Sequence, residues 1–93
     1  MLWQSRIGRG FEAAITIYDH GKPDIVRAYF REVTGRVSTM DVYLAVGTDP
    51  GRASAIGCGV VRDELQRASL TDVRWVIYAG NGEAVASSDE GCP

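Results

Sequence analysis

The segment after Asp49 constrains the fold most, because signals for the start and the body of a helix occur there together. Asp49 is a favourable N-cap, and Pro50 suits the first helical position because its φ is already fixed near the helical value. One broad apolar face then follows at helical spacing: Ala53, Ile56, Gly57, Val60, Val61, Leu65 and Ala68. We therefore predict one long amphipathic helix over 50–68.

Three residues inside this helix are unusual. Glu64 lies near the middle of the apolar face. Gly57 and Gly59 each weaken a helix by about 1 kcal/mol relative to alanine. Because glycine has no Cβ, we expect these two positions either to allow close approach to a sheet or a partner, or to kink the helix.

Two segments before the helix have the alternation of half-buried strands. Residues 11–18 alternate between apolar and polar side chains. Residues 40–47 do the same, which places Met40, Val42, Leu44 and Val46 on one side. Both segments are therefore predicted strands, and the turn residues around 47–51 connect the second one to the helix.

A hairpin is predicted after the helix. Residues 73–78 are rich in residues that favour strands, and residues 83–87 form a short return strand. Between them lies Asn81-Gly82, the strongest short hairpin signal.

Residues 23–34 give conflicting signals. Their apolar residues fall on one side at helical spacing, and Pro23 and Gly35 suit the two ends of a helix. Their composition, rich in β-branched and aromatic residues, favours a strand, and the tight turn before them suits a hairpin. We predict a strand slightly over a short helix.

The chain length sets the scale of the fold. A chain of 93 residues forms one domain with a small core. We predict a single α+β domain over 1–93, with a mostly antiparallel sheet, the 50–68 helix packed on one face, and loose ends at about 1–9 and 88–93. If 23–34 were helical, the order would be βαβαββ and part of the sheet would be parallel.

The net charge of −2 argues against a protein whose main task is to coat duplex nucleic acid. Lys22 is the only lysine, so nine of the ten basic residues are arginines. This bias is typical of GC-rich coding sequences, but arginine also serves interfaces, because its guanidinium pairs with carboxylates and stacks on rings.

Two cysteines do not indicate a disulfide scaffold. We expect Cys58 to be a small core residue of the helix and Cys92 a free thiol in the tail, although a bridge between them is an alternative. The N-terminal residues lack the apolar stretch of a signal peptide, and no run of 18 apolar residues is long enough for a membrane span. We therefore expect a cytoplasmic protein that has no membrane partner.

The sequence offers little for catalysis or metal binding. His20 is the only histidine and lies in a predicted turn, so a zinc site or a Ser–His or Cys–His pair would lack ligands or a base. Neither a Walker A pattern nor GxSxG is present, and Asp49 already occupies the helix N-terminus where an anion could bind. We predict no catalytic residue, no cofactor and no metal, and hence no enzyme.

Aromatic and arginine side chains on the predicted strands are the remaining functional signal. These candidate partner-binding residues are Arg27, Tyr29, Arg31, Tyr43, Arg74 and Trp75. On an open sheet face the rings could stack on bases or anchor a protein interface. They could equally fill the small core. The acidic balance favours a protein partner over nucleic acid.

The part of the chain from Gly47 onward resembles some small phage-encoded anti-CRISPR proteins directed at type I systems. The residues that carry the resemblance are Gly47-Thr48-Asp49-Pro50-Gly51, Ala53-Ser54-Ala55, Val76-Ile77 and Asn81. It covers under half of the chain, and the first 46 residues show no match. The resemblance implies a non-enzymatic inhibitor that binds a CRISPR surveillance complex or its nuclease. It carries over no binding residue.

Together these observations predict a small inhibitor or adaptor that acts by binding a protein, which could be a Cas protein or complex. The alternative is a small RNA- or single-stranded-DNA-binding module that uses sheet aromatics and arginines. A homodimer is also expected as an option, because a 93-residue core is marginal and exposed sheet edges invite pairing.

Overall fold

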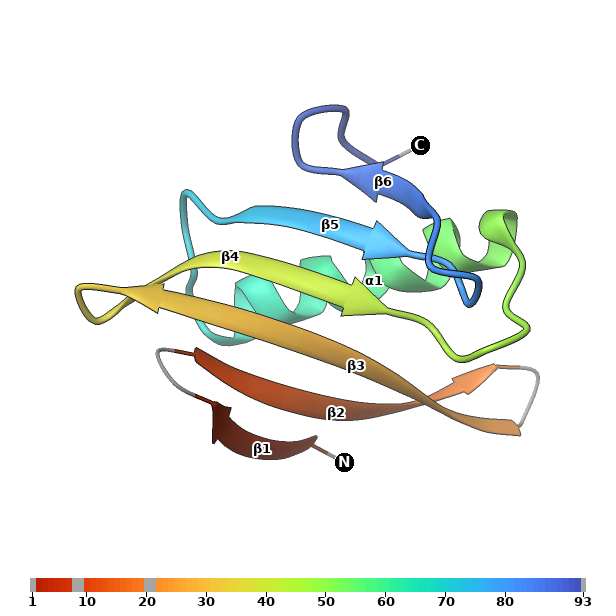
Figure 1. Cartoon of the computed structure of the whole chain (residues 1–93), viewed down its shortest axis with the longest axis horizontal. Coiled ribbons are helices and arrows are strands. Elements are labelled where there is room, and N and C mark those ends of the chain that lie inside the picture. The colour runs from red at the N-terminus through yellow and green to blue at the C-terminus, as the bar shows by residue number, and fades with distance from the viewer. Residues whose placement is uncertain (1, 8–9, 20–21, 93) are drawn as a thin grey trace.

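The computed structural model describes residues 2–7, 10–19 and 22–92, and it describes side chains over 10–17 and 24–92. Six strands form one sheet in chain order, and one helix packs on one side of it (Figure 1). The elements are β1 (Leu2–Ile7), β2 (Gly10–Asp19), β3 (Lys22–Val33), β4 (Arg36–Tyr43), α1 (Pro50–Arg67), β5 (Arg74–Tyr78) and β6 (Ala84–Ser87). The predicted α+β class is confirmed.

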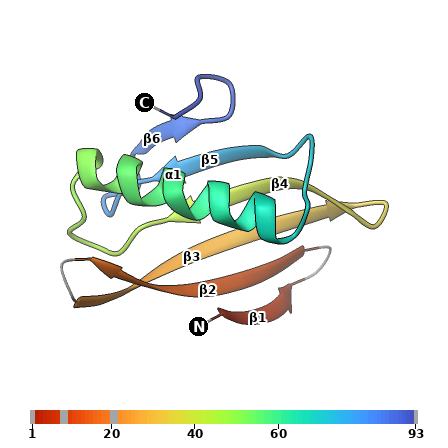
Figure 2. The same ribbon diagram turned by 180° about the vertical axis from the view of Figure 1, so that it is seen from behind.

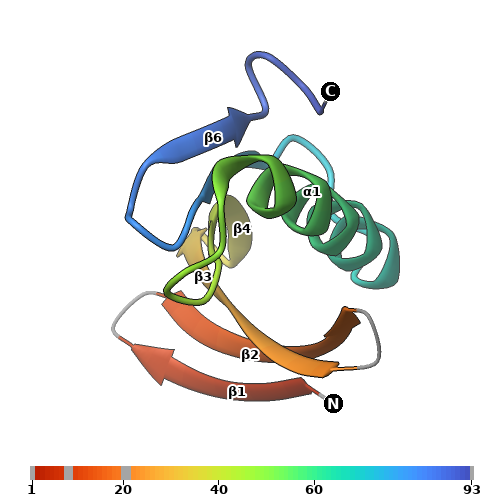
Figure 3. The same ribbon diagram turned by 90° about the vertical axis from the view of Figure 1, so that its right-hand side faces the viewer.

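The connections explain the layer arrangement. Strands β1 to β4 form an antiparallel meander, whereas β5 runs parallel to β4 and pairs with β6 in antiparallel fashion. A parallel neighbour needs a crossover connection, and α1 supplies it. The helix contacts β4, β5 and β6 and lies entirely on one side of the sheet (Figures 2 and 3). The other face of the sheet is left without a helix.

The helix begins and ends close to its predicted bounds. The Asp49 carboxylate accepts a hydrogen bond of 3.0 Å from the backbone N–H of Arg52, so Asp49 is the N-cap, and Pro50 opens the helix as predicted. The C-cap is Ala68. The side of α1 that faces the sheet, one face of β2 to β6 and the loop residues Leu44 and Ala79 together form the core: Ala13, Val26, Ala28, Phe30, Met40, Val42, Leu44, Ala53, Val60, Val61, Trp75, Ile77, Ala79 and Ala86.

The unusual helix residues have different explanations. A Cβ at Gly57 would lie 2.4 Å from Cγ2 of the buried Ile77, so Gly57 is where the helix approaches the sheet most closely, and α1 runs unbroken through it. At Gly59 the nearest atom would be 3.9 Å away, so no close approach requires glycine there. Glu64 is buried as its position suggested, and its carboxylate pairs with the Arg67 guanidinium at 2.5 Å.

The strand predicted for 23–34 is confirmed as β3, which ends at Val33, and the helical alternative is wrong. β3 pairs with β2 on one side and β4 on the other, which satisfies its backbone donors and acceptors along most of its length. Val26, Ala28 and Phe30 point into the core at a period of two. Ile25 and Val33, which helical spacing placed on the buried side, are both about half exposed.

The fourth strand ends earlier than expected. β4 stops at Tyr43, and although Met40, Val42 and Leu44 are buried as predicted, Val46 is 94% exposed. The chain leaves the sheet because a turn closes through a hydrogen bond from the Thr48 N–H to the Ala45 carbonyl. The alternation over 40–47 therefore overestimated the strand by four residues.

The described parts of the two predicted loose ends pair with the rest of the sheet. Residues 2–7 form β1, which pairs with β2 over its whole length and satisfies a row of backbone groups that would otherwise form a free edge. At the other end, the Ser88 N–H and the Ser88 hydroxyl both bond to the backbone of Trp75. A turn then brings Gly91 back to Ser87.

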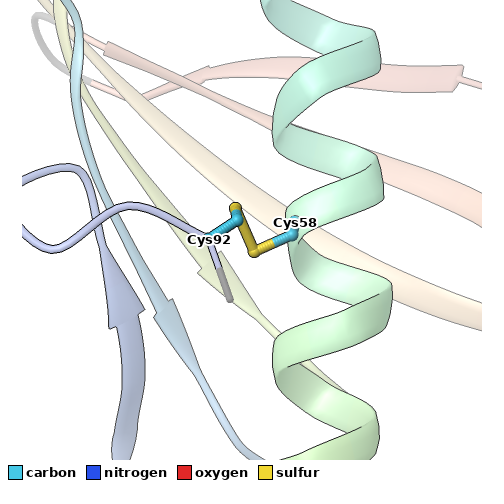
Figure 4. The surroundings of a disulfide bond; sticks show 2 residues. All are labelled: Cys58 and Cys92. Atoms are coloured by element: carbon cyan, nitrogen blue, oxygen red, sulfur yellow. A yellow bond between two sulfur atoms is a disulfide. The ribbon is translucent and has the colours of Figure 1, made fainter.

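The cysteine prediction is also wrong. Cys58 and Cys92 form a disulfide that ties the middle of α1 to the segment after β6 (Figure 4). Their Cα atoms are 6.0 Å apart, well within the range of natural disulfides. The turn after β6 folds the chain back toward the helix, and this return is what brings Cys92 within reach of Cys58.

Within the part of the chain that the structure describes, no helix is both long enough and apolar enough to cross a membrane.

Candidate functional site

The strongest candidate site is the open face, defined here as the side of the sheet opposite α1 (Figure 1). Strand register places five of the six candidate side chains on it. Tyr43 of β4 lies opposite Arg27 of β3, and Tyr29 of β3 lies opposite Asp41 of β4. Arg31 and Arg74 both lie opposite Thr39 of β4, one on each side. Side chains alternate between faces along a strand, so these residues share the face that the core residues avoid.

Trp75 is the exception, and its assignment to a binding surface is wrong. Only 9% of it is exposed, because it shares the parity of Ile77 on β5 and points toward α1. Its neighbours Arg74 and Val76 point to the open face. Alternation along β5, with a second apolar residue two positions after Trp75, was a signal for burial that the sequence already contained.

Three tyrosines form the centre of the open face. The ring centroids of Tyr29 and Tyr43 are 5.4 Å apart with nearly perpendicular planes. Tyr43 stacks on Tyr78 of β5 with a centroid distance of 4.7 Å and an interplanar angle of 10°. Tyr78 was missed from the sequence, although it lies four residues after Arg74 on the same face. These rings make a continuous aromatic surface across three neighbouring strands, and Tyr43 in its middle is 38% exposed.

Arg27 is held by an ion pair at one side of this cluster. Its Nη1 atom donates to Oε1 of Glu12 on β2 at 2.9 Å, and Glu12 is only 8% exposed. The hydrogen bond with Glu12 is the main cause that raises the pKa of the Arg27 guanidinium, and a second one with Tyr29 adds to it. Glu12 was not among the predicted site residues. This pair fixes the Arg27 guanidinium beside the Tyr29 ring.

A carboxylate lies beside the rings. Asp41 is partly buried, and this burial raises the pKa of its carboxyl group, while the nearby Arg31 charge acts in the opposite direction. Burial also raises the pKa of the Tyr43 hydroxyl, and the Asp41 carboxylate is the next largest cause. Both groups therefore lie in a surface that water solvates only in part, where polar contacts with a partner are stronger than in bulk water.

An open depression of about 790 Å³ lies at one end of β2, β3 and β4. Residues of both sides of the sheet line it: Gly10, Phe11, Tyr29, Phe30, Arg31, Glu32, Val33, Thr39 and Asp41. Arg31 and Arg74 are exposed on either side of Thr39. Neither has an ion-pair partner among the described side chains, in contrast to Arg27.

A second depression, of about 480 Å³, lies on the outer side of α1 beside the disulfide. It is lined by small residues with Arg62, and Ser54 contributes a buried hydroxyl that has no hydrogen-bond partner. Over the described residues, no group of three or more His, Cys, Asp or Glu side chains is placed to hold a metal ion. His20 lies outside the described residues.

Comparison of the chain with protein-family models, with curated proteins and with solved structures found no match in any of the three.

Proposed function

We propose that this chain is a non-enzymatic protein that acts by binding a protein partner through its open face. The observation that carries the proposal is the tyrosine cluster of Tyr29, Tyr43 and Tyr78, which lies partly exposed and flanked by arginines on the face without a helix. Tyrosine and arginine are the residue types that contribute most to the centres of protein interfaces. The rings are already packed on each other, so binding would order few further side-chain torsions.

A CRISPR–Cas complex is the first partner class to test, on the strength of the resemblance to small phage-encoded anti-CRISPR proteins. The residues of that resemblance build the cap of α1, its first turn, and β5 with its turn. They lie largely outside the open face. The resemblance therefore suggests the class of partner, whereas the proposed binding residues come from the geometry of the open face. An inhibitor of this kind would act by occupying a surface of the surveillance complex or its nuclease.

The test is recovery of partners by tagged protein from a lysate of a host with an active type I system, with and without nuclease. We expect the wild type to recover a defined complex that survives nuclease. Tyr43→Ala should lose it, because it removes the ring that contacts both other tyrosines. Val46→Ala is the control, since Val46 is the most exposed large apolar side chain and lies outside the sheet.

Equal recovery by wild type and Tyr43→Ala, with both variants shown to be folded, would contradict the proposal. Separate binding assays with purified surveillance complex and with purified nuclease then test by themselves whether the partner is a CRISPR–Cas component. If the protein binds neither purified component, the anti-CRISPR assignment is wrong, but the proposal that the open face binds a protein still stands.

The second candidate is a small RNA- or single-stranded-DNA-binding module, and the exposed rings beside arginines are the observation that favours it. Two features count against it. Tyr43 and Tyr78 stack on each other, so each has one ring face occupied. Asp41 also places a carboxylate on the same face, where it repels phosphates. Nucleic-acid binding would weaken steeply with salt and would be lost after nuclease treatment.

We propose the cytoplasm as the compartment, because a CRISPR–Cas partner would be met there. The Cys58–Cys92 bond is the observation against this compartment, since disulfides are rare in reducing cytosol. Rapid alkylation of thiols in intact cells, followed by mass spectrometry, decides the matter. Cys58 and Cys92 labelled as free thiols would support a cytoplasmic protein whose bond forms only after lysis, whereas protected cysteines would indicate an oxidising site.

A further inference from the structure

We infer that Arg31, Thr39 and Arg74 form an anion clamp on the open face, and that it receives a carboxylate from an acidic segment of the protein partner. This inference rests on the proposed function and gives the chemistry of its partner.

The clamp residues lie in one row across three neighbouring strands. Thr39 of β4 is opposite Arg31 of β3 and opposite Arg74 of β5. Strands in a sheet lie about 4.8 Å apart, so the two arginine Cα atoms are separated by about 10 Å with the threonine between them. Two guanidinium groups on side chains of this length can converge on one anion above Thr39, and its hydroxyl supplies a third donor.

The clamp arginines lack the carboxylate partners that Arg27 and Arg67 have. Arg27 is paired with Glu12 and Arg67 with Glu64, at 2.9 and 2.5 Å. The guanidinium groups of Arg31 and Arg74, by contrast, have no hydrogen bond or ion pair with any described residue, and both side chains are exposed. Asp41 in the next row interacts with Arg31 electrostatically.

Charge placement favours a discrete carboxylate over a nucleic acid. The row next to the clamp contains Glu12, Tyr29, Asp41 and Val76. Glu12 is buried and paired with Arg27, so a continuous phosphate backbone leaving the clamp along the strands would meet the carboxylate of Asp41. A single Asp or Glu side chain fills the clamp without crossing that row.

The test is an NMR titration of the ¹⁵N-labelled protein with the probe peptide acetyl-Gly-Glu-Glu-Gly-amide. We expect weak but saturable shifts centred on the amides of Thr39, Arg31 and Arg74, and on the guanidinium Nε–H groups of both arginines. The double variant Arg31→Glu/Arg74→Glu should bind the peptide at least about tenfold more weakly, a loss typical of a reversed charge pair. Arg62→Glu is the matched control, because Arg62 is an exposed arginine on α1.

Four results would overturn the clamp. The first is that a peptide with Gln in place of Glu shifts the same resonances equally. The second is that the shifts caused by the Glu peptide centre on other residues. A ten-nucleotide single-stranded RNA could bind these residues more tightly than the acidic peptide. Sedimentation could show a dimer that the double reversal breaks, which would make a second copy the occupant.

Failure of the clamp is distinguishable from failure of the binding face. If lysate recovery depends on Tyr43 while the peptide causes no shift, the clamp is wrong and the face still binds a protein. If neither depends on the open face, both inferences fall together.

Discussion

The two faces of one sheet differ sharply although the same strands build both. On the covered face, Met40, Val42 and Ile77 are fully buried under α1. At the alternate positions of the same strands, the open face presents Tyr43 and Tyr78. The difference teaches that the face to which a strand position points, more than residue type, decides whether an aromatic side chain stabilises the fold or is available to a partner.

The pair Trp75→Ala and Tyr43→Ala tests this comparison with the largest expected effect. Truncation of the buried Trp75 should lower the free energy of unfolding by about 3–5 kcal/mol, because it removes a large core side chain and leaves a cavity. Tyr43→Ala should cost less than about 1.5 kcal/mol, since the ring is more than one-third exposed. Urea unfolding of both variants measures this, and equal losses would break the distinction between the faces.

Removal of the disulfide affects the covered side only. Cys58→Ser should lower the free energy of unfolding by about 2–4 kcal/mol, because the bond closes a loop with a sequence separation of 34 residues and restricts the unfolded chain. The open face lies on the other side of the sheet, so tyrosine-dependent binding should persist where the variant is folded. Unfolding with and without reductant checks the first point. A wild type that reductant does not destabilise would contradict it.

A matched pair of glycines sharpens the account of the covered side. Gly57→Ala should be destabilising by about 1–2 kcal/mol, because the new methyl group meets Ile77 and the strain exceeds the gain in helix propensity. Gly59→Ala should be stabilising by up to about 1 kcal/mol, because it gains propensity without a close contact. Thermal unfolding separates them. Stabilisation at both positions would show that helix propensity alone decides the outcome and that the contact with Ile77 does not matter.

The smallest effect concerns Asp41 on the open face. Burial raises the pKa of its carboxyl group above the ordinary 3.8, so the folded state binds this proton more tightly than the unfolded state does. The ionised form therefore costs stability at neutral pH, and this cost disappears as the pH falls through the raised pKa. We expect Asp41→Asn to be slightly more stable than wild type at pH 7.

The measurement is the difference in unfolding free energy between Asp41→Asn and wild type from pH 7 down to pH 3. It should shrink as the pH falls. An Asp41→Asn variant that is less stable than wild type at pH 7, with the deficit closing as the pH falls, would mean that attraction to Arg31 outweighs burial.

The sequence predicted the α+β class and α1 well, because capping and periodicity are local signals. Alternation along β3 and β5 was also readable, and it would have assigned Trp75 to the core beside Ile77. The disulfide was not predictable in the same way, since it depends on the turn that brings Cys92 back to α1. The Glu12–Arg27 pair likewise depends on the register between β2 and β3, and no local pattern in the sequence specifies that register.

The most direct test of the central claim, that the open face is the binding surface, is a tyrosine-nitration footprint of the protein alone and in its recovered complex, quantified by mass spectrometry. We predict that Tyr29, Tyr43 and Tyr78 react in the free protein and are protected together in the complex. Unchanged nitration of all three in a stable complex would contradict the claim and place the partner elsewhere on the molecule.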